Sequence, residues 1–298
     1  MSDTYFKGMP WQYFKEFISP EANRYLIIKK LLQEAALSYD ILEIAGNRHF
    51  YITPPSGTAK NNVSNQPPII LTAHYDRTEG SPGANDNSAG VFLLIETAIK
   101  LKAGKVKNWI IIFTDREELK SGESIQVQGS FTLAAGLKKM GMGSARLFCF
   151  DACGTGDTLV ISTTADYIVK KEKNNLKLRE SISELRKMAL DTARNLGMVK
   201  ALLAPTPFSD DVGFLMAGFA AQTITVLPSA ECINLVSELR KNPDYANALI
   251  SAEIQKDAKT KPIPETWRYL NSPSDSHLRL TPENYRSIIR FADALCRG

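Results

Sequence analysis

Short, unbroken apolar runs alternate along this chain with longer segments whose apolar residues recur every three or four positions. The unbroken runs, rich in β-branched residues, are typical of strands buried on both faces of a sheet. They lie at residues 69–72, 109–114, 146–150 and 223–226. The periodic segments predict helices at roughly residues 88–102, 130–140, 178–196 and 281–296. This alternation predicts a three-layer α/β/α fold around a mixed, mostly parallel sheet.

The N-terminal part of the chain precedes this alternation of predicted strands and helices. Residues 20–37 predict an amphipathic helix that Ser19 caps and that has Pro20 at its first position. Residues 41–44 and 50–53 predict two short strands. The following residues, 56–68, are rich in Asn, Ser, Gly and Pro, which indicates a loop or a hairpin tip.

The C-terminal part carries two further signals. Thr281 followed by Pro282 predicts the capped start of the last helix. Residues 231–270 are helical and polar in pattern, and we expect a possible flap over a site there. No internal repeat or low-complexity segment divides the chain, so residues 1–298 are expected to form a single domain.

Composition and charge narrow the function classes. A chain of 298 residues with 44% hydrophobic and 23% charged residues is typical of a globular protein with a large core. The net charge of +4 is spread along the chain, and its densest cluster, Lys170, Lys171 and Lys173, is typical of a solvated loop. We therefore expect no nucleic-acid partner. The sequence gives no signal for the oligomeric state.

The compartment is predicted from what the sequence lacks. The chain has no secretory signal and no apolar stretch long enough for a membrane span, so we expect no membrane partner. Its four cysteines form no C-x-x-C pair and are expected to be reduced thiols. These features predict a cytoplasmic protein.

Imidazole and carboxylate side chains come after the predicted strands, at the edge of the sheet where the strands end. In α/β sheets, ligands bind beyond the carboxyl ends of the strands, where such side chains converge. Mixed imidazole and carboxylate ligands favour divalent cations. With two ions, one carboxylate has to bridge them and another has to stay free as a base, a division that adjacent Glu117 and Glu118 fit. The candidate residues are His74, Asp76, Asp86, Glu117, Glu118 and Asp151.

Histidine is scarce in this chain, which supports the hypothesis of a metal site. The chain has His49, His74 and His277, and the last two each lie within two residues of an aspartate, Asp76 or Asp275. A carboxylate close to a metal-binding imidazole can fix its tautomer and orientation. His49 is expected to be structural.

The ordered set resembles the co-catalytic zinc aminopeptidases, whose superfamily also includes glutaminyl cyclases and glutamate carboxypeptidases. The resemblance rests on His74-Tyr75-Asp76, the segment Gly83-Ala84-Asn85-Asp86-Asn87-Ser88-Ala89-Gly90, Glu117-Glu118, Asp151 and His277. It implies two zinc ions and hydrolysis of the N-terminal bond of a peptide substrate. The further expectation of an apolar first residue assumes a pocket lined by residues such as Phe208 and Phe214.

The resemblance also implies a role for each residue. His74 and Asp151 would bind the first metal ion, and Asp86 would bridge to the second. Glu118 and His277 would bind the second ion. Glu117 would be the general base, and Asp76 would orient His74.

One segment departs from the family pattern. Phe208-Ser209-Asp210-Asp211 resembles a segment near the family's active site, where the family often has Ser-Asp-His. This chain has Asp211 in place of that histidine.

Other interpretations remain open at this point. Asp86 and Asn87 could be turn and cap residues only. Cys153 could form a nucleophilic pair with a histidine, although neither a local signature nor an orienting group supports one. A glutaminyl cyclase or a non-catalytic binding protein could use the same scaffold. A carboxypeptidase would need a cationic pocket, which Arg77, Arg116 or Arg268 could supply.

Overall fold

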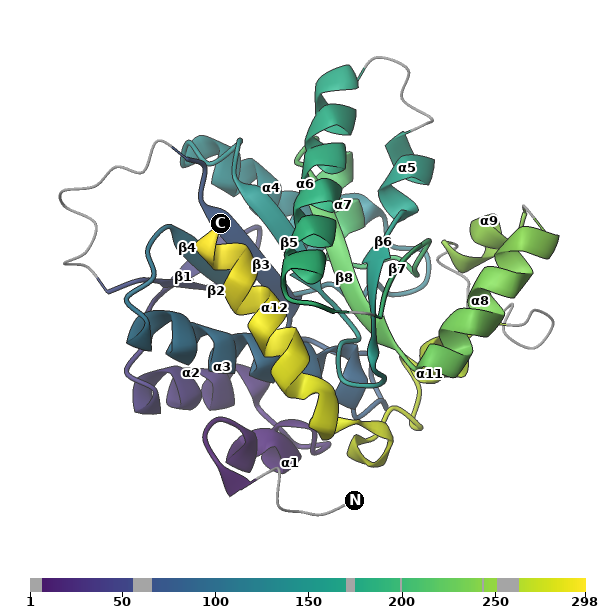
Figure 1. Cartoon of the computed structure of the whole chain (residues 1–298). Coiled ribbons are helices and arrows are strands. Elements are labelled where there is room, and N and C mark those ends of the chain that lie inside the picture. The colour runs from purple at the N-terminus through teal and green to yellow at the C-terminus, as the bar shows by residue number, and fades with distance from the viewer. Residues whose placement is uncertain (1–6, 56–65, 170–174, 199, 243, 251–262) are drawn as a thin grey trace.

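A computed structural model describes residues 7–55, 66–169, 175–198, 200–242, 244–250 and 263–298 of the chain (Figure 1). Its centre is an eight-stranded sheet in the order β1-β2-β4-β3-β5-β8-β6-β7. The strands are β1 (Ser38–Ile44), β2 (Asn47–Thr53), β3 (Ile69–His74), β4 (Trp109–Thr114), β5 (Arg146–Phe150), β6 (Thr158–Ser162), β7 (Ala201–Ala204) and β8 (Ala221–Leu227).

The four central strands, β4, β3, β5 and β8, pair in parallel. Antiparallel pairs join β1 to β2, β2 to β4 and β8 to β6, and β7 pairs in parallel with β6. The sheet is therefore mixed, as predicted. The predicted strands at residues 109–114 and 146–150 are confirmed to the residue, whereas β6 and β7 were not predicted.

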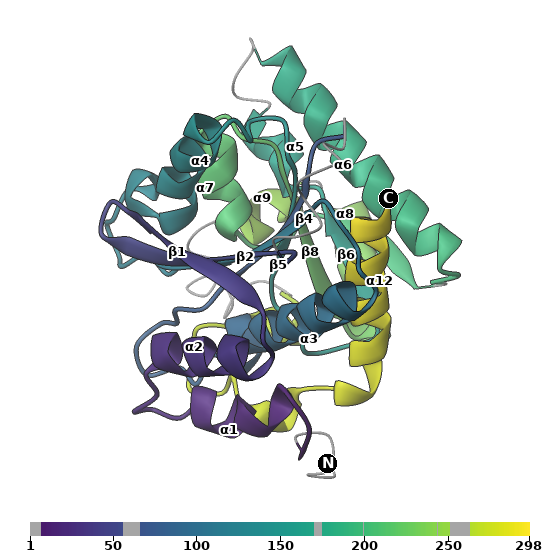
Figure 2. The ribbon, with the colours of Figure 1, turned by 90° about the vertical axis from the view of Figure 1, so that its left-hand side faces the viewer.

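Helices cover both faces of the sheet (Figure 2). On one face lie α2 (Arg24–Glu34), α3 (Ala89–Ala103), α6 (Leu176–Asn195) and α12 (Tyr285–Arg297). On the other lie α4 (Gly129–Lys139) and α7 (Asp210–Met216). The short helices α1 (Phe14–Phe17) and α5 (Thr164–Val169) extend these layers. The predicted three-layer α/β/α fold is confirmed.

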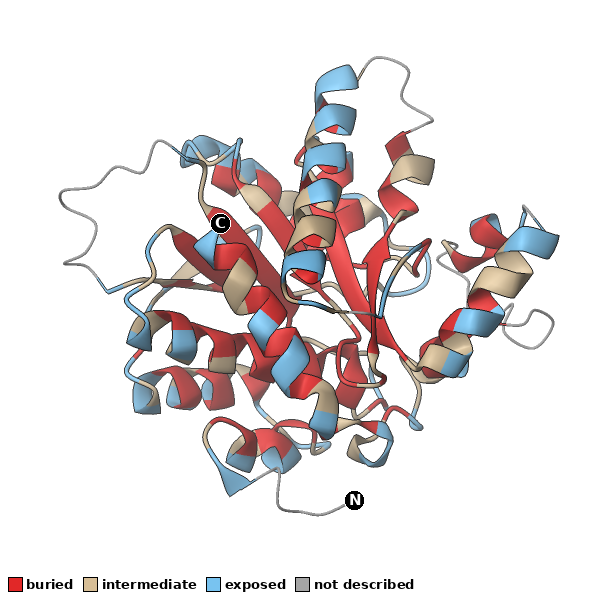
Figure 3. Cartoon of the chain, in the orientation of Figure 1, coloured by how far each residue is buried: buried red, intermediate tan, exposed pale blue. Residues whose placement is uncertain are grey.

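The side chains of β3 show how the sheet serves two cores. Ile69 and Leu71 pack in the core beneath α3 and α12, whereas Ile70 packs in the core beneath α4 and α7. Because both faces are buried, the strand sequence is an unbroken apolar run rather than an alternating one. Figure 3 shows the strands buried and the outer sides of the helices exposed.

Two predicted helix starts were wrong. The helix predicted at residues 20–37 is α2, which begins at Arg24, and the side chain of Asn23 accepts its capping hydrogen bond from the Leu26 amide at 3.1 Å. The last α-helix begins at Tyr285, after a 3-10 turn at Pro282–Asn284. Thr281 does not cap it, because its hydroxyl accepts a hydrogen bond from the Gly156 amide at 2.7 Å.

The segment expected to be a flap is helical where it is described. It contains α8 (Ser229–Lys241), α9 (Tyr245–Leu249) and α11 (Glu265–Tyr269), while residues 251–262 lie outside the described part. Cys232, Leu249 and Trp267 bury their side chains together with Val160 of β6. Its role as a flap stays a prediction. The expected loop at residues 56–68 also lies mostly outside the described residues.

None of the helices in the described part of the chain combines the length and apolar character needed to cross a membrane.

Candidate metal centre

His74 is the last residue of β3 and lies at the centre of a ring of carboxylates. Its side chain is 1% exposed. The Nε2 atom lies 3.0 Å from Oδ1 of Asp86 and 3.7 Å from Oδ1 of Asp151, while Nδ1 lies 3.3 Å from Oδ1 of Asp76. The three acidic groups come from the ends of β3 and β5 and from the segment before α3, so the predicted convergence at the strand ends is observed.

Asp76 connects His74 to the end of the next strand. One of its carboxylate oxygens faces the imidazole, and the other accepts a hydrogen bond from the Glu118 amide at 3.0 Å. Burial raises the pKa of Asp76, but the hydrogen bond and charge of His74 outweigh burial and hold that pKa below its ordinary value. Asp76 is thus an anion placed to orient the imidazole.

Asp86 lies in an irregular turn, Ala84–Ser88, that precedes α3. The Asn85 side chain accepts a hydrogen bond from the Gly154 amide at 2.7 Å, and the Asn87 side chain donates one to the Phe150 carbonyl at 2.7 Å. Neither this turn nor α3 has a side-chain cap. The polar residues therefore join the turn to the chain around Asp151, and the interpretation as capping residues is wrong.

Asp275 holds the backbone of this same turn. Its two carboxylate oxygens accept hydrogen bonds from the amides of Asn85 and Asp86 at 2.8 and 3.0 Å. We had expected Asp275 to orient His277. In the structure Asp275 instead holds Asp86, because the buried amides of the turn need hydrogen-bond acceptors.

Glu117 and Glu118 follow β4 and have different partners. Oε1 of Glu117 accepts a hydrogen bond from the side-chain amide of Gln128 at 3.0 Å. Oε2 of Glu118 accepts one from the Thr78 hydroxyl at 2.9 Å, and its Oε1 is buried without a partner. Burial, together with neighbouring carboxylates, raises the pKa of both glutamates well above the ordinary value.

Of the described residues, His74, Asp86 and Glu118 form the group whose ligand atoms all lie within 4.8 Å of one another. Asp151 follows β5, and its Oδ1 is buried without a hydrogen-bond partner. Buried carboxylates are normally paired or bound to a cation. The unpartnered oxygens of Glu118 and Asp151, beside an imidazole, therefore fit a divalent metal ion.

His277 is placed apart from this group. It begins the 3-10 turn His277–Arg279, and its side chain is half-buried. It does not belong to the group of mutually close ligand atoms. Its assignment as a ligand of a second ion stays a prediction.

The site contains buried groups that we did not assign from the sequence. Asp210 accepts a hydrogen bond from the hydroxyl of Thr114, the last residue of β4, and burial raises its pKa to about 6. Burial raises the pKa of Asp211 to about 7. Asp210 and Asp211 lie in the segment that resembles the family motif, so the sequence did indicate them. Nothing in the sequence distinguishes Gln128 and Thr78 from ordinary polar residues.

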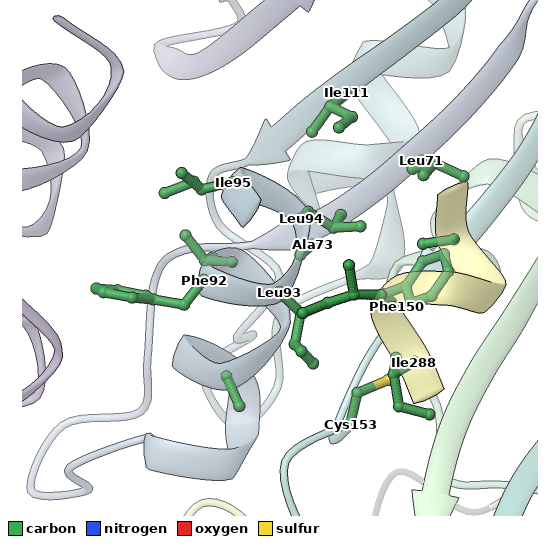
Figure 4. Packing of buried hydrophobic residues seen from close by; sticks show 14 of the residues in the cluster. Leu71, Ala73, Phe92, Leu93, Leu94, Ile95, Ile111, Phe150, Cys153 and Ile288 are labelled. Atoms are coloured by element: carbon green, nitrogen blue, oxygen red, sulfur yellow. The ribbon is translucent and has the colours of Figure 1, made fainter. Parts of the chain in front are cut away.

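Cys153 is not a candidate nucleophile in this structure. It is buried beside Ile288, in the apolar core beneath α3 and α12 (Figure 4). Burial raises the pKa of its thiol well above the ordinary value, which disfavours the reactive thiolate. All four cysteines are free and buried, as expected for reduced thiols.

The residues proposed for substrate pockets have other partners. Arg77 donates to the carbonyls of Ser19 and Pro20 at 2.9 and 2.8 Å. Arg116 pairs with Glu123 at 3.0 Å, and Arg268 donates to the Ile263 carbonyl at 3.3 Å. None of these contacts places a free cation beside His74. Phe214 is fully buried in the core between α4 and α7, so it does not line a pocket.

Comparison with known proteins gives the following matches. The sequence profile of peptidase family M28 matches residues 56–292. A search of curated proteins found no match.

Solved structures share the fold at low sequence identity. A zinc aminopeptidase from Bacillus subtilis is 20% identical, with a TM-score of 0.53 over 83% of this chain and 49% of that one, so this chain spans about half its length. A leucine aminopeptidase precursor from Bacteroides thetaiotaomicron is 14% identical, with a TM-score of 0.60 over 96% and 95% of the two chains. A glutaminyl cyclase from the same organism is 14% identical, with a TM-score of 0.61 over 96% of both chains.

Proposed function

The chain belongs to peptidase family M28, and from this premise we propose that it is a zinc-dependent aminopeptidase. The observation that carries the proposal is a group that could hold a metal ion, His74, Asp86 and Glu118, beside a carboxylate with a raised pKa, Glu117, that is not part of the group. A metal site with a separate base is suited to the activation of water. The aminopeptidases that share the fold support the same reaction class.

We assign five ligands to two ions. His74 and Asp151 would hold the first, Glu118 and His277 would hold the second, and Asp86 would serve both. Bound divalent ions lower the pKa of water and stabilise negative charge on the carbonyl oxygen. Asp76 contributes from outside this set by holding the His74 imidazole through Nδ1.

Glu117 is the proposed general base. It accepts the proton of the attacking water and then donates it to the leaving amine. Gln128 donates a hydrogen bond to Oε1 of Glu117, which leaves Oε2 for the water. The hydroxyl of Ser130 donates to the amide oxygen of Gln128 at 2.9 Å and thereby turns the amide nitrogen toward Glu117.

The test is a comparison of blocked peptides. The metal-loaded protein is offered one short peptide in free, N-acetylated and C-terminally amidated forms, and products are identified by mass spectrometry. We expect release of the first amino acid from the free and amidated forms only, because an aminopeptidase requires a free amine. Dependence on a free carboxylate would instead make the protein a carboxypeptidase, and no reaction at full metal loading would make it a binding protein.

A glutaminyl cyclase is the second candidate. The fold likeness to the Bacteroides cyclase, which covers 96% of both chains, favours it. Against it, Asn87-Ser88-Ala89-Gly90 after Asp86 resembles the peptidases more than the cyclases. A peptide with an N-terminal glutamine separates the two: the aminopeptidase releases glutamine, whereas the cyclase releases ammonia and leaves a pyroglutamyl peptide.

A further inference from the structure

A buried arginine reaches the metal centre from outside the part of the chain that the family profile matches. Arg24 is the first residue of α2, whereas the matched region begins at residue 56. Its side chain is 6% exposed, and its guanidinium lies 4.7 Å from the ring centroid of Phe17. A guanidinium buried this completely needs partners for its five N–H donors.

Nε donates to the Phe17 carbonyl at 3.3 Å, and the other partners are oxygen atoms on the two segments that carry the proposed ligands. Nη1 donates to the carbonyls of Tyr75 and Asp76 at 3.1 and 2.9 Å, directly after His74. Nη2 donates to the Pro82 carbonyl at 2.8 Å and the Ser88 hydroxyl at 2.9 Å, on either side of Asp86. One planar group thus contacts both segments.

Gly83 shows that the second segment is shaped around this guanidinium. Its φ of +56° lies in the left-handed region, which favours glycine. A Cβ at this position would lie 2.6 Å from the Asp86 carbonyl oxygen and 3.0 Å from Nη2 of Arg24. No side chain fits at Gly83 between the Asp86 carbonyl and the guanidinium of Arg24.

Burial and the charge of Arg77 lower the pKa of Arg24 to about 9, and the charges of Asp76, Asp86 and Asp275 offset part of that lowering. A second arginine also connects the N-terminal segment to the loop after β3, but this arginine lies on the loop and its partners lie on the N-terminal segment. Arg77, on the loop after β3, donates to the carbonyls of residues 18–20.

We propose that Arg24 is a positioning residue of the metal centre: it fixes the distance between the segment that carries His74 and Asp76 and the segment that carries Asp86. This inference rests on the metal site of the proposed function. It makes the N-terminal segment, which the family profile leaves out, part of the site. A lysine cannot replace Arg24 fully, because its ammonium is a point charge without a planar fork.

The test compares the zinc affinities of the wild type, Arg24→Met and Arg24→Lys, each stripped of metal and titrated in competition with a chromogenic chelator. We expect Arg24→Met to lose roughly 10- to 100-fold in affinity, the range for residues that orient metal ligands, and Arg24→Lys to lose less. Circular dichroism establishes that each variant is folded. If Arg24→Met does not fold, Arg24→Lys decides the question.

The matched control is Glu96→Ala. Glu96, on α3, accepts a hydrogen bond from the Trp11 indole at 2.7 Å and so holds the N-terminal segment on α3. The Glu96→Ala variant should have a lower melting temperature, but its zinc affinity should stay within about twofold of the wild-type value. Wild-type affinity in the folded Arg24 variants, or an equal loss in Glu96→Ala, would overturn the inference. Arg24-dependent zinc binding without any peptide hydrolysis would overturn the proposed function alone.

Discussion

At the scale of single residues, Glu117 and Glu118 differ through partners that are distant in sequence. Glu117 accepts a hydrogen bond from Gln128, which lies eleven residues later in the chain. Glu118 accepts one from Thr78, which lies forty residues earlier. The sequence predicted that one glutamate is a ligand and the other a base, and the resemblance gave their order. Nothing local in the sequence could have identified the two partners, because the fold brings them together.

Glu117→Gln should abolish turnover while the metal content stays unchanged. The amide cannot accept the proton of water, and removal of a general base costs on the order of 10²- to 10⁴-fold in rate. Peptide hydrolysis and metal analysis on the same sample measure both effects. Glu118→Gln is the matched control and should lose metal. Loss of metal in Glu117→Gln would show that the two roles are exchanged.

Gln128→Leu should lower turnover less than Glu117→Gln and move the acidic limb of the pH–rate profile to higher pH. The Gln128 amide stabilises the ionised form of Glu117, so its removal raises the pKa of the base and leaves less of it ionised at low pH. The pH dependence of kcat/KM measures this. A lower rate with an unmoved profile would mean that Gln128 only supports the fold.

At the scale of elements, the sequence predicted the strands that build the site because each is buried on both faces. Residues 109–114 and 146–150 form β4 and β5 as expected. The edge strand β7 was missed because Ala201–Ala204 contains no β-branched residue and is only partly buried. Helix starts were misplaced where an asparagine or a 3-10 turn replaced the expected cap.

The turn Ala84–Ser88 carries Asp86 into contact with His74, which motivates a comparison of two metal-site variants. Asp86→Ala should disrupt both metal positions, because a bridging carboxylate serves two ions. His277→Ala should weaken mainly the second position. Metal stoichiometry is measured on both purified variants. Two metal ions per chain in Asp86→Ala would contradict the bridging role.

Asp211, in the first turn of α7, is expected to make the free energy of unfolding depend on pH. Burial raises the pKa of Asp211 from 3.8 to about 7, so its ionisation destabilises the folded state increasingly as pH rises from about 4 through 7. The effect reaches at most roughly 4 kcal/mol at pH 8. Asp211→Asn should therefore reduce the fall in melting temperature between pH 5 and pH 8.

Asp157→Asn is the control for this pH dependence. The contacts of Asp157 with Lys200 and Ser229 outweigh its burial and lower its pKa to about 2. Its contribution to stability is lost only as pH falls below about 4, so the variant should leave the slope between pH 5 and pH 8 unchanged. An unchanged slope in Asp211→Asn would show that Asp211 is not the group responsible.

At the scale of the whole molecule, the layers were predictable and the long-range contacts were not. Apolar periodicity predicts which residues face a core, and Ile28, Leu31 and Leu32 of α2 are buried there. Arg24 lies one turn before Ile28 on that side of the helix, but periodicity alone does not predict that its guanidinium is buried against the carbonyls that follow His74. Asp275 likewise holds Asp86 across the fold.

The most direct measurement is a crystal structure of the zinc-loaded protein with anomalous scattering recorded at the zinc edge. We expect two zinc peaks about 3.5–4 Å apart, the separation typical of two-metal sites. Asp86 should lie between them, His74 and Asp151 on one ion, and Glu118 and His277 on the other. A single peak, or peaks that are not in contact with Asp86, would contradict the account.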